Sequence, residues 1–305
     1  MSHELFDRIA VLTVFRALTE TVTQADGAKG ILVTGYEDKG KQFRSTMADG
    51  SPGFRIRFNC KKTMSLSPNF GSIAIYNINE ESRSYFERTN NLVTLEVGYA
   101  NSPKLIFKGN VGRGRTTKVG DDYITTVEVQ DGLYAVQNSR IDQSFNPGIQ
   151  KNAAITTMVD AIAAVPGMAK GQIYGLPNDG YNQGVVLSGP AMDKLKEVCD
   201  GNDLNFFVED HKIYILPVGT ARDNPPVKLS VETGLVGIPE RGNGRLSLRA
   251  LLNPEISLLQ LVLVKSKFVN GIFVANQVTN TGDTWGNEWF SEIECNYPGS
   301  DEAAF

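Results

Sequence analysis

Few side chains in this sequence have types and spacings that could perform acid–base chemistry. Asp210 and His211 are adjacent and could together transfer a proton. No GxSxG or similar nucleophile motif accompanies them, and they lie between the strand-like segments NFFVED and KIYILPV. We therefore predict that they form a hairpin turn in which the imidazole of His211 is exposed to solvent.

Two pairs of carboxylates have the composition that glycoside hydrolysis requires, where the separation of two acids sets the mechanism. Asp121 and Asp122 follow Gly120 in a predicted turn, and Glu292 and Glu294 alternate on one face of a predicted strand. Both settings are ordinary for solvated carboxylates. We therefore predict no catalytic residue and no enzymatic activity.

The possible metal ligands are too few and too scattered for a structural zinc site. Cys60, Cys199 and Cys295 lie far apart with no CxxC pair, and the only histidines are His3 and His211. We expect no bound metal and no cofactor. Sparse, unpaired cysteines are typical of a reducing compartment, so we expect the chain to fold in a cytoplasm.

The segment GNVGRGRTTK, residues 109–118, could be compared with a phosphate-binding loop because glycines surround its basic side chains. It lacks the strand–loop–helix context and the Lys-Ser/Thr ending of a P-loop, so we predict a polar hairpin. If the chain forms a ring, basic residues of this segment could face the channel and tune the passage of DNA or a tape protein. The candidates are Arg113, Arg115 and Lys118.

Length, charge and hydropathy restrict the class of protein. A chain of 305 residues can hold two or three domains. The formal net charge of −4 argues against a general nucleic-acid binder, and we predict no sequence-specific contact with nucleic acid. The N-terminal run IAVLTVF is short and follows Glu4 and Asp7, and no segment approaches the roughly twenty apolar residues that span a bilayer. We expect neither a secretion signal nor contact with a membrane.

The elements that carry these residues are mostly strands in the first part of the chain. Seven short runs alternate apolar and polar residues at about ten-residue spacing, which predicts a closed or nearly closed antiparallel sheet. One helix is predicted over residues 80–88, with Asn79 as its cap. We assign residues 1–138 to a first β-barrel domain. Its predicted strands are VLTVF, ILVTGY, FRIRFNC, SIAIYNI, LVTLEVGY, KLIFKGNV and YITTVEV.

Residues 139–222 differ in composition and predict a small α/β insertion domain. Asn152 can cap a helix whose apolar residues recur at helical spacing until Pro166. Ser188 can cap a second helix that has Pro190 in its first turn. The hairpin around Asp210 and His211 closes the unit.

Residues 223–298 return to strands and predict a second antiparallel barrel domain, followed by a flexible acidic tail over residues 299–305. The run from Ile256 to Val264 is apolar on both faces, which one-sided burial does not explain. We predict that this run is a central strand or one that meets a neighbouring subunit. The interface candidates are Leu259, Leu261 and Leu263, with the edge region around Phe273.

Short motifs of strands and turns follow one another in a distinctive order. In the first half these are IYNI, LEVGY, IFKGNV, a GDD turn and TTVEVQDG; in the second they are SGPAMDKLKEVCDGNDLNFFVEDHKIYIL, VETGLVGIPE, ALLNPEI and GDTWGNEWFSEIE. Over residues 8–296 this order resembles the baseplate hub proteins of contractile-tailed bacteriophages. Each motif alone is weak, so the resemblance depends on their shared order. The chain departs from the family at residues 257–259, where a glycine-centred turn is usual.

The resemblance implies a fold and an assembly. It implies a mainly β chain with two tail-tube-like antiparallel β-barrel domains and the α/β insertion between them. Three copies would place six similar barrels in a ring and join a three-fold central spike to a six-fold tail tube. The implied partners are further copies in a homotrimer, the tail tube protein, the central spike protein, and wedge and tape-measure proteins. The protein would then be a structural virion component of the tail baseplate, folded in the bacterial host cytoplasm, with DNA passing through its channel.

The rival hypothesis is a carbohydrate-binding tail or cell-surface recognition module. Phe206, Phe207, Tyr214, Trp285 and Trp289 could form a platform on which sugar rings stack. Aromatic residues on alternating strands are more often core or interface anchors, which favours the hub. Phages, prophage remnants and other contractile injection systems use similar hubs, and the sequence is compatible with each of them.

Overall fold

The computed structural model describes residues 7–23, 29–65, 67–99, 102–242 and 244–297. It confirms the predicted fold class, because the chain is mainly β and its sheets are largely antiparallel. The predicted tail, residues 299–305, lies outside the described residues.

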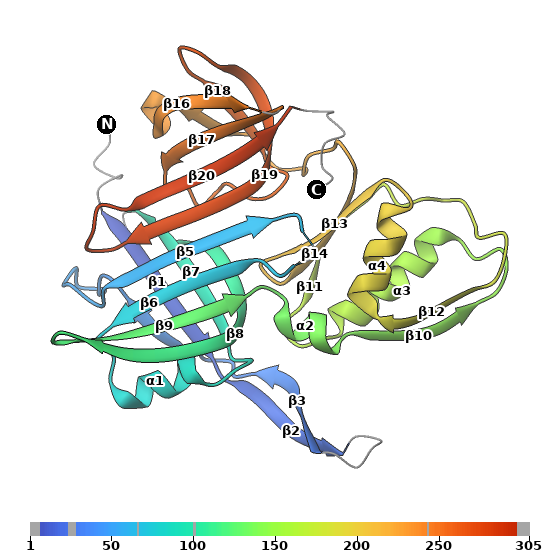
Figure 1. Cartoon of the computed structure of the whole chain (residues 1–305), viewed down its shortest axis with the longest axis horizontal. Coiled ribbons are helices and arrows are strands. Elements are labelled where there is room, and N and C mark those ends of the chain that lie inside the picture. The colour runs from blue at the N-terminus through green and yellow to red at the C-terminus, as the bar shows by residue number, and fades with distance from the viewer. Residues whose placement is uncertain (1–6, 24–28, 66, 100–101, 243, 298–305) are drawn as a thin grey trace.

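One thirteen-stranded sheet runs through both halves of the chain (Figure 1). Its strands follow the order β16-β17-β20-β19-β5-β6-β9-β8-β7-β1-β4, with β18 beside β19 and β15 beside β18. The halves join where β5 pairs with β19. The strands are β1 (Arg8–Phe15), β4 (Lys41–Arg44), β5 (Ile56–Thr63), β6 (Phe70–Tyr76), β7 (Leu92–Tyr99), β8 (Lys104–Val119), β9 (Asp122–Gln130), β15 (Val227–Ser230), β16 (Leu235–Gly242), β17 (Arg245–Leu251), β18 (Leu261–Lys265), β19 (Asn270–Asp283) and β20 (Trp289–Asn296).

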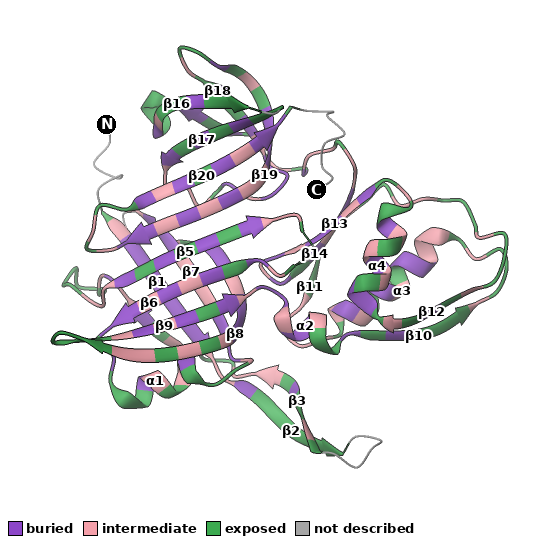
Figure 2. Cartoon of the chain, in the orientation of Figure 1, coloured by how far each residue is buried: buried purple, intermediate pink, exposed green. Residues whose placement is uncertain are grey.

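Alternating burial explains why these segments form strands. Along β5, Ile56, Phe58 and Cys60 are buried, while Arg57 and Asn59 between them are exposed. Figure 2 shows the same alternation along neighbouring strands of the sheet. Because side chains in a strand point to opposite faces in turn, the apolar residues gather on one face. The sheet therefore has one buried face and one polar face.

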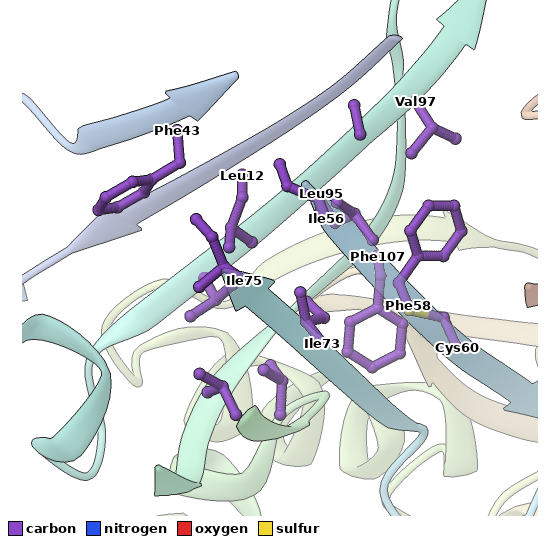
Figure 3. Close-up of a cluster of buried hydrophobic side chains, with 14 of the residues drawn as sticks. Leu12, Phe43, Ile56, Phe58, Cys60, Ile73, Ile75, Leu95, Val97 and Phe107 are labelled. Atoms are coloured by element: carbon purple, nitrogen blue, oxygen red, sulfur yellow. The ribbon is translucent and has the colours of Figure 1, made fainter. Parts of the chain in front are cut away.

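The buried face of the first half closes around a hydrophobic core (Figure 3). β8 bends, so its beginning pairs with β7 and its end pairs with β9. β7, β1 and β4 thus pass behind β5, β6 and β9, and side chains such as Leu12, Ile75 and Phe107 meet between the two layers. In the described part of the chain no ladder joins β4 to β5, but Phe54 N donates a hydrogen bond to Arg44 O at 2.9 Å. The barrel is therefore nearly closed.

Helix α1 (Glu80–Glu87) confirms the helix predicted after Asn79. The side-chain oxygen of Asn79 accepts a hydrogen bond from Ser82 N at 2.9 Å, which caps the first turn. Phe86 of α1 is fully buried in the first core. Gly114 of β8 lies against the helix so closely that a Cβ at this position would overlap the carbonyl oxygen of Phe86. The close approach of α1 to β8 therefore requires glycine.

The segment ILVTGY forms a strand, but it is not part of the barrel. It belongs to β3 (Lys29–Tyr36), which pairs with β2 (Ala17–Thr23) in a separate two-stranded hairpin that extends from the body (Figure 1). Only the base of the hairpin packs on the body, through Ala17 and Val33 against Tyr134. The prediction that this segment joins the barrel was wrong, because an alternating pattern does not specify the partner of a strand.

The second half buries its own core, and the apolar run from Ile256 to Val264 enters it in an unexpected way. β18 begins only at Leu261. Before it, Gln260 N donates a hydrogen bond to Ser257 O in a turn where Leu259 has a φ of 54°. Ile256, Leu258 and Leu259 are all buried. The prediction of one doubly apolar strand was therefore wrong, since much of the run is a turn that packs its side chains into the core.

A lobe of helices and two small sheets lies beside the large sheet (Figure 1) and buries a third core. The predicted helices are present, but their caps differ: α3 begins after Gln150 rather than after Asn152, and α4 begins after Pro190. Ser188 does not cap α4 because it still pairs with Asp142 in a ladder. The elements are α2 (Leu133–Asn138), β10 (Arg140–Phe145), α3 (Lys151–Ala163), β11 (Ala169–Ile173), β12 (Val185–Pro190), α4 (Ala191–Asp200), β13 (Leu204–Glu209) and β14 (Lys212–Pro217).

Candidate functional site

The polar face of the large sheet spans eight strands, four from each half of the chain. They are β8, β9, β6 and β5 from the first half, and β19, β20, β17 and β16 from the second. Residues that lie opposite each other in an antiparallel ladder point to the same face. One such row runs across four strands through Arg115, Thr126, Ala74 and Arg57.

In the first half, the polar face carries positive charges that lack carboxylate partners. Arg113 and Arg115 of β8 and Lys61 of β5 are exposed. Glu128 lies opposite Arg113 in the ladder, yet none of these three cations forms an ion pair with another residue of the described ranges. These side chains are free to meet an external anion.

In the second half, the arginines of the polar face, Arg245 and Arg249, are paired with carboxylates. Arg249 Nε lies 3.8 Å from Glu292 Oε1, and Arg245 Nη1 lies 3.6 Å from Glu294 Oε2. Gln277 Nε2 also donates a hydrogen bond to Glu294 at 3.0 Å. Glu292 and Glu294, the two carboxylates of β20 considered above for hydrolysis, therefore form surface ion pairs with arginines of β17.

Depressions interrupt the polar face both where its halves meet and within the second half. One, of about 380 Å³, lies between the β5–β6 turn and the end of the β19–β20 ladder and is lined by Lys61, Phe70, Arg245 and Glu294 among others. The second, of about 270 Å³, is lined by residues that include Arg249 and Glu292. Both are formed by side chains that already belong to the polar face.

The structure brings two of the three predicted channel residues together. Arg113 and Arg115 are two positions apart on β8 and share the polar face. Lys118 has the opposite parity, so its side chain points to the other side, where its Nζ lies 5.6 Å from the centre of the Tyr123 ring. The segment GNVGRGRTTK is a strand, and the hairpin turn follows it at Gly120, which has a positive φ.

The four predicted interface residues lie in two different environments. Leu259 and Phe273 are buried within the second core of the same chain, so they offer no surface to a partner. Leu261 is half-buried, and Leu263 is exposed on the outer face of β18, opposite the exposed Ile272 of β19. Contact of Leu261 and Leu263 with another subunit stays a prediction.

A buried cluster of charges joins the two halves and the lobe. Lys62, at the end of β5, is only 3% exposed. Its Nζ lies 2.7 Å from Asp210 Oδ2 and 3.2 Å from Glu209 Oε1, both at the β13–β14 turn of the lobe. Arg222, in the segment that leads to β15, forms a further ion pair with Glu209. Burial opposes the charge of Lys62, but the charges of Asp210 and Glu209 outweigh it and raise the pKa of the ammonium group.

This cluster was not predicted from the sequence, although β5 contains a signal for it. Ile56, Phe58, Cys60 and Lys62 occupy the same parity, and the first three point into the core. A lysine at an inward position must find buried carboxylates or lose its charge. The alternation alone could therefore have shown that Lys62 needs a buried partner, but it could not have shown which residue that partner is.

His211 lies in the predicted hairpin turn, but the prediction that its imidazole is exposed was wrong. His211 and Asp210 both have positive φ values, and His211 is almost completely buried. The reason is Asp131, whose carboxylate accepts hydrogen bonds from Asp210 N at 2.6 Å and His211 N at 2.8 Å and holds the turn against the barrel. Burial, followed by the nearby charge of Lys108, lowers the pKa of His211 to about 3, so the imidazole is neutral and makes no acid–base pair at pH 7.

We expect stability to fall as the pH rises between about 6.5 and 8. Burial first, and then the charge of Asp210, raise the pKa of Asp131 to about 8 from an ordinary value near 3.8. A raised carboxyl pKa means that the folded state holds a proton that the unfolded chain has lost, so its stabilising effect disappears as the pH approaches 8. His211 acts in the opposite direction, but only below about pH 6.5. Urea unfolding at several pH values measures the slope; Asp131→Asn should flatten it, and an unchanged slope in that variant would contradict the assignment.

The five aromatic residues proposed as a sugar platform do not share one surface. Phe206, Phe207 and Trp289 are buried. Tyr214 stacks on Phe207 with ring centres 5.3 Å apart and is covered by the guanidinium of Arg222. Trp285 is exposed at the β19–β20 turn, away from β13 and β14 of the lobe, which hold Phe206, Phe207 and Tyr214. No stacking platform forms from these five side chains.

Metal ligands and membrane spans were also sought within the described residues. There, no group of three or more His, Cys, Asp or Glu side chains has an arrangement that could hold a metal ion. None of the described helices combines the length and the apolar character needed to cross a bilayer. Cys60, Cys199 and Cys295 are buried free thiols.

Comparison with known proteins identifies the fold. A scan against protein-family models finds no match, and a search of the curated proteins finds none either. Solved structures do match along the chain. The 43 kDa tail protein of prophage MuSo2 from Shewanella oneidensis aligns with a TM-score of 0.59 at 9% identity, over 96% of this chain and 99% of that one.

Two further structures support the same fold. A tail protein from Neisseria meningitidis MC58 gives a TM-score of 0.59 at 8% identity, over 98% of this chain and 99% of that one. An E. coli component of the type VI secretion system, described as similar to the T4 bacteriophage tail proteins gp27 and gp5, gives 0.55 at 10% identity over 82% of this chain and 74% of that one. At these identities the shared property is the fold, which is that of phage tail proteins.

Proposed function

We propose that this chain is a structural tail protein, a baseplate hub that assembles as a homotrimer and joins the six-fold tail tube to the three-fold central spike of a contractile tail. The observation that carries the proposal is the continuous sheet with one polar face, to which each half of the chain contributes four strands. Two such halves per chain become six in a trimer, which lets three copies meet a six-fold tube. The tail-protein fold supports the same assignment.

The two ends of the eight-stranded polar face favour assembly into a ring. The end of β8, residues 111–119, lies at one end and β16 at the other, and neither pairs with a further strand of the described chain on its outer side. Exposed strand edges favour association with another chain. A head-to-tail contact from the β8 end of one copy to the β16 end of the next would repeat around a three-fold axis and leave no end free.

The polar face would then line the channel of the ring. Arg113 and Arg115 would offer unpaired positive charge to the phosphates of passing DNA, whereas the arginines of the second half are neutralised by Glu292 and Glu294. Tight binding to DNA needs many unneutralised cations. A face on which positive and negative charges nearly balance therefore suits a channel through which DNA moves without sequence-specific contact.

We assign residues 1–138 and 223–298 to the two tube-like barrels, and residues 139–222 to the α/β insertion. The insertion lobe lies beside the sheet rather than across its polar face (Figure 1), so it would leave a channel open. It would then be available to the central spike, to baseplate wedge proteins or to the tape-measure protein. The chain acts in this role by shape and interface area, without catalysis, and resides in the virion.

The mass of the full chain in solution tests the proposal. Light scattering at several concentrations is expected to give a particle near three times 33.3 kDa, and negative-stain images of the same sample are expected to show a ring with a central channel. A monomer at every concentration would contradict the trimeric hub. If that monomer bound glycans on an array, the carbohydrate-binding module would replace the hub as the leading function.

A further inference from the structure

The β2–β3 hairpin is an arm with little support from the rest of the chain. Its base is fixed, since Val33 N donates a hydrogen bond of 2.7 Å to the Tyr134 hydroxyl and Ala17 is buried beside them. Beyond the base most of the described residues are exposed, and Ile31 is 73% exposed. A two-stranded hairpin alone in water is only marginally stable. An arm of this kind needs a surface to lie on.

Both faces of the arm carry exposed apolar side chains. Ile31 lies opposite Thr21 on one face, whereas Leu32 lies opposite Glu20 on the other. Leu18 and Val22 flank Glu20 on its own face and are exposed as well. The face that holds Leu18, Glu20, Val22 and Leu32 is therefore apolar with one negative charge in its middle, whereas Lys29 lies on the face of Ile31.

A complementary surface lies on the opposite side of the folded molecule. On the outer face of the β15–β18–β19 layer, Leu263 lies opposite both Ile272 and Lys228, and all three are exposed. Lys265 is exposed on the same face, two positions after Leu263. This apolar patch is thus bordered by positive charge, where the arm has Glu20. Three further exposed apolar residues lie in or next to β15, β16 and the β18–β19 turn, namely Val231, Ile238 and Phe268.

The positions of the arm and the patch suit a head-to-tail contact. The arm leaves the body beyond the β8 side of the sheet, and the patch lies at the β16 and β18 side, at the other extreme of the molecule (Figure 1). The two surfaces lie too far apart to meet within one chain. A surface whose complement lies elsewhere on the same molecule makes a heterologous contact, which closes into a ring when the rotation permits.

We propose that the β2–β3 arm of one copy packs on the Leu263–Ile272 patch of the next copy, with Glu20 between Lys228 and Lys265. The contact rests on the proposed trimer and specifies what holds it together. Pairing of strand edges alone is a poor candidate, because β16 contains Pro239 and its register with β17 is broken between Val236 and Glu240. Side-chain packing by the arm supplies the area that this irregular edge does not.

Light scattering on the full chain tests the contact with two matched variants. Leu32→Asp places a charge beside Glu20, on the face of the arm that meets the patch, and is expected to reduce the particle mass about threefold, from trimer to monomer. Its far-UV circular dichroism spectrum should match that of the wild type, since Leu32 is exposed and belongs to no core. Val186→Asp is the control, because Val186 is also exposed, on β12 of the lobe, and belongs to neither surface. It should leave the mass unchanged.

Cysteine cross-linking identifies which surfaces meet. The native cysteines are buried, so introduced thiols at the surface react selectively. The double variant Leu32→Cys with Leu263→Cys should form covalent dimers and trimers on mild oxidation, whereas each single variant should not. A cross-link in Leu32→Cys alone would mean that two arms pair with each other and would overturn the proposal. A wild-type trimer that responds neither to Leu32→Asp nor, in the double cysteine variant, to oxidation would overturn the arm contact only, whereas a wild-type monomer would overturn the trimer as well.

Discussion

Lys62→Met is expected to lower the free energy of unfolding by about 3–5 kcal/mol, the usual cost of removing one partner from a buried ion pair. Lys62 is the only described cation within ion-pair distance of Asp210, while Glu209 keeps Arg222. The variant leaves the partly buried carboxylate of Asp210 without its counter-charge at the point where the barrel meets the lobe. Urea denaturation followed by circular dichroism at constant pH measures the change.

Lys61→Met is the matched control for this experiment. Lys61 is the neighbouring residue on β5, but it points to the polar face and is exposed, so its substitution should change stability by less than about 0.5 kcal/mol. Adding Asp210→Asn to Lys62→Met should restore part of the loss, because the uncompensated charge is then removed. Equal effects of Lys61→Met and Lys62→Met would contradict the buried cluster.

Trp289→Ala is expected to destabilise the chain by about 3–5 kcal/mol, as truncation of a large core side chain does. Trp289 begins β20 in the second half, yet it is fully buried in the core of the first half. Its ring lies 5.5 Å from that of Phe58 and 6.5 Å from that of Tyr99, measured between centres. The cavity left by alanine would weaken the contact that fixes the two halves to each other, which the proposed ring requires.

The chain contains its own control for this prediction. Trp285 lies four positions earlier and is 65% exposed at the β19–β20 turn, so Trp285→Ala should change the free energy of unfolding by no more than about 0.5 kcal/mol. Thermal and urea unfolding of both variants, followed by far-UV circular dichroism, compares them directly. If the two tryptophans proved equally dispensable, the assignment of Trp289 to the first core would be wrong.

Features that depend on neighbours in sequence were predicted well. The alternation in FRIRFNC predicted β5, and Asn79 predicted the start of α1, because a strand's two faces and a helix cap are set within a few residues. The turn at Asp210 and His211 was also recognised from its flanking strands. The turn at Gly120, beside Asp121, was also predicted, because glycine adopts a positive φ without steric cost.

Features that depend on distant partners were not predicted. The exposed imidazole expected at His211 is buried because Asp131, from a different part of the chain, accepts hydrogen bonds from the turn. The segment ILVTGY has the pattern of a barrel strand but leaves the barrel to pair with β2. Leu259 looked like part of a strand, but its side chain reaches the core from a turn.

The sequence by itself therefore determined the mainly β class, most strands and the first helix, and it indicated an ordered series of motifs like that of tail hub proteins. Tertiary structure alone decided that β5 pairs with β19 into one sheet, that Lys62 meets Glu209 and Asp210, and that Trp289 belongs to the first core. The physical reason is that periodicity records which face of an element is apolar, whereas the identity of the element covering that face depends on packing between residues far apart in the chain.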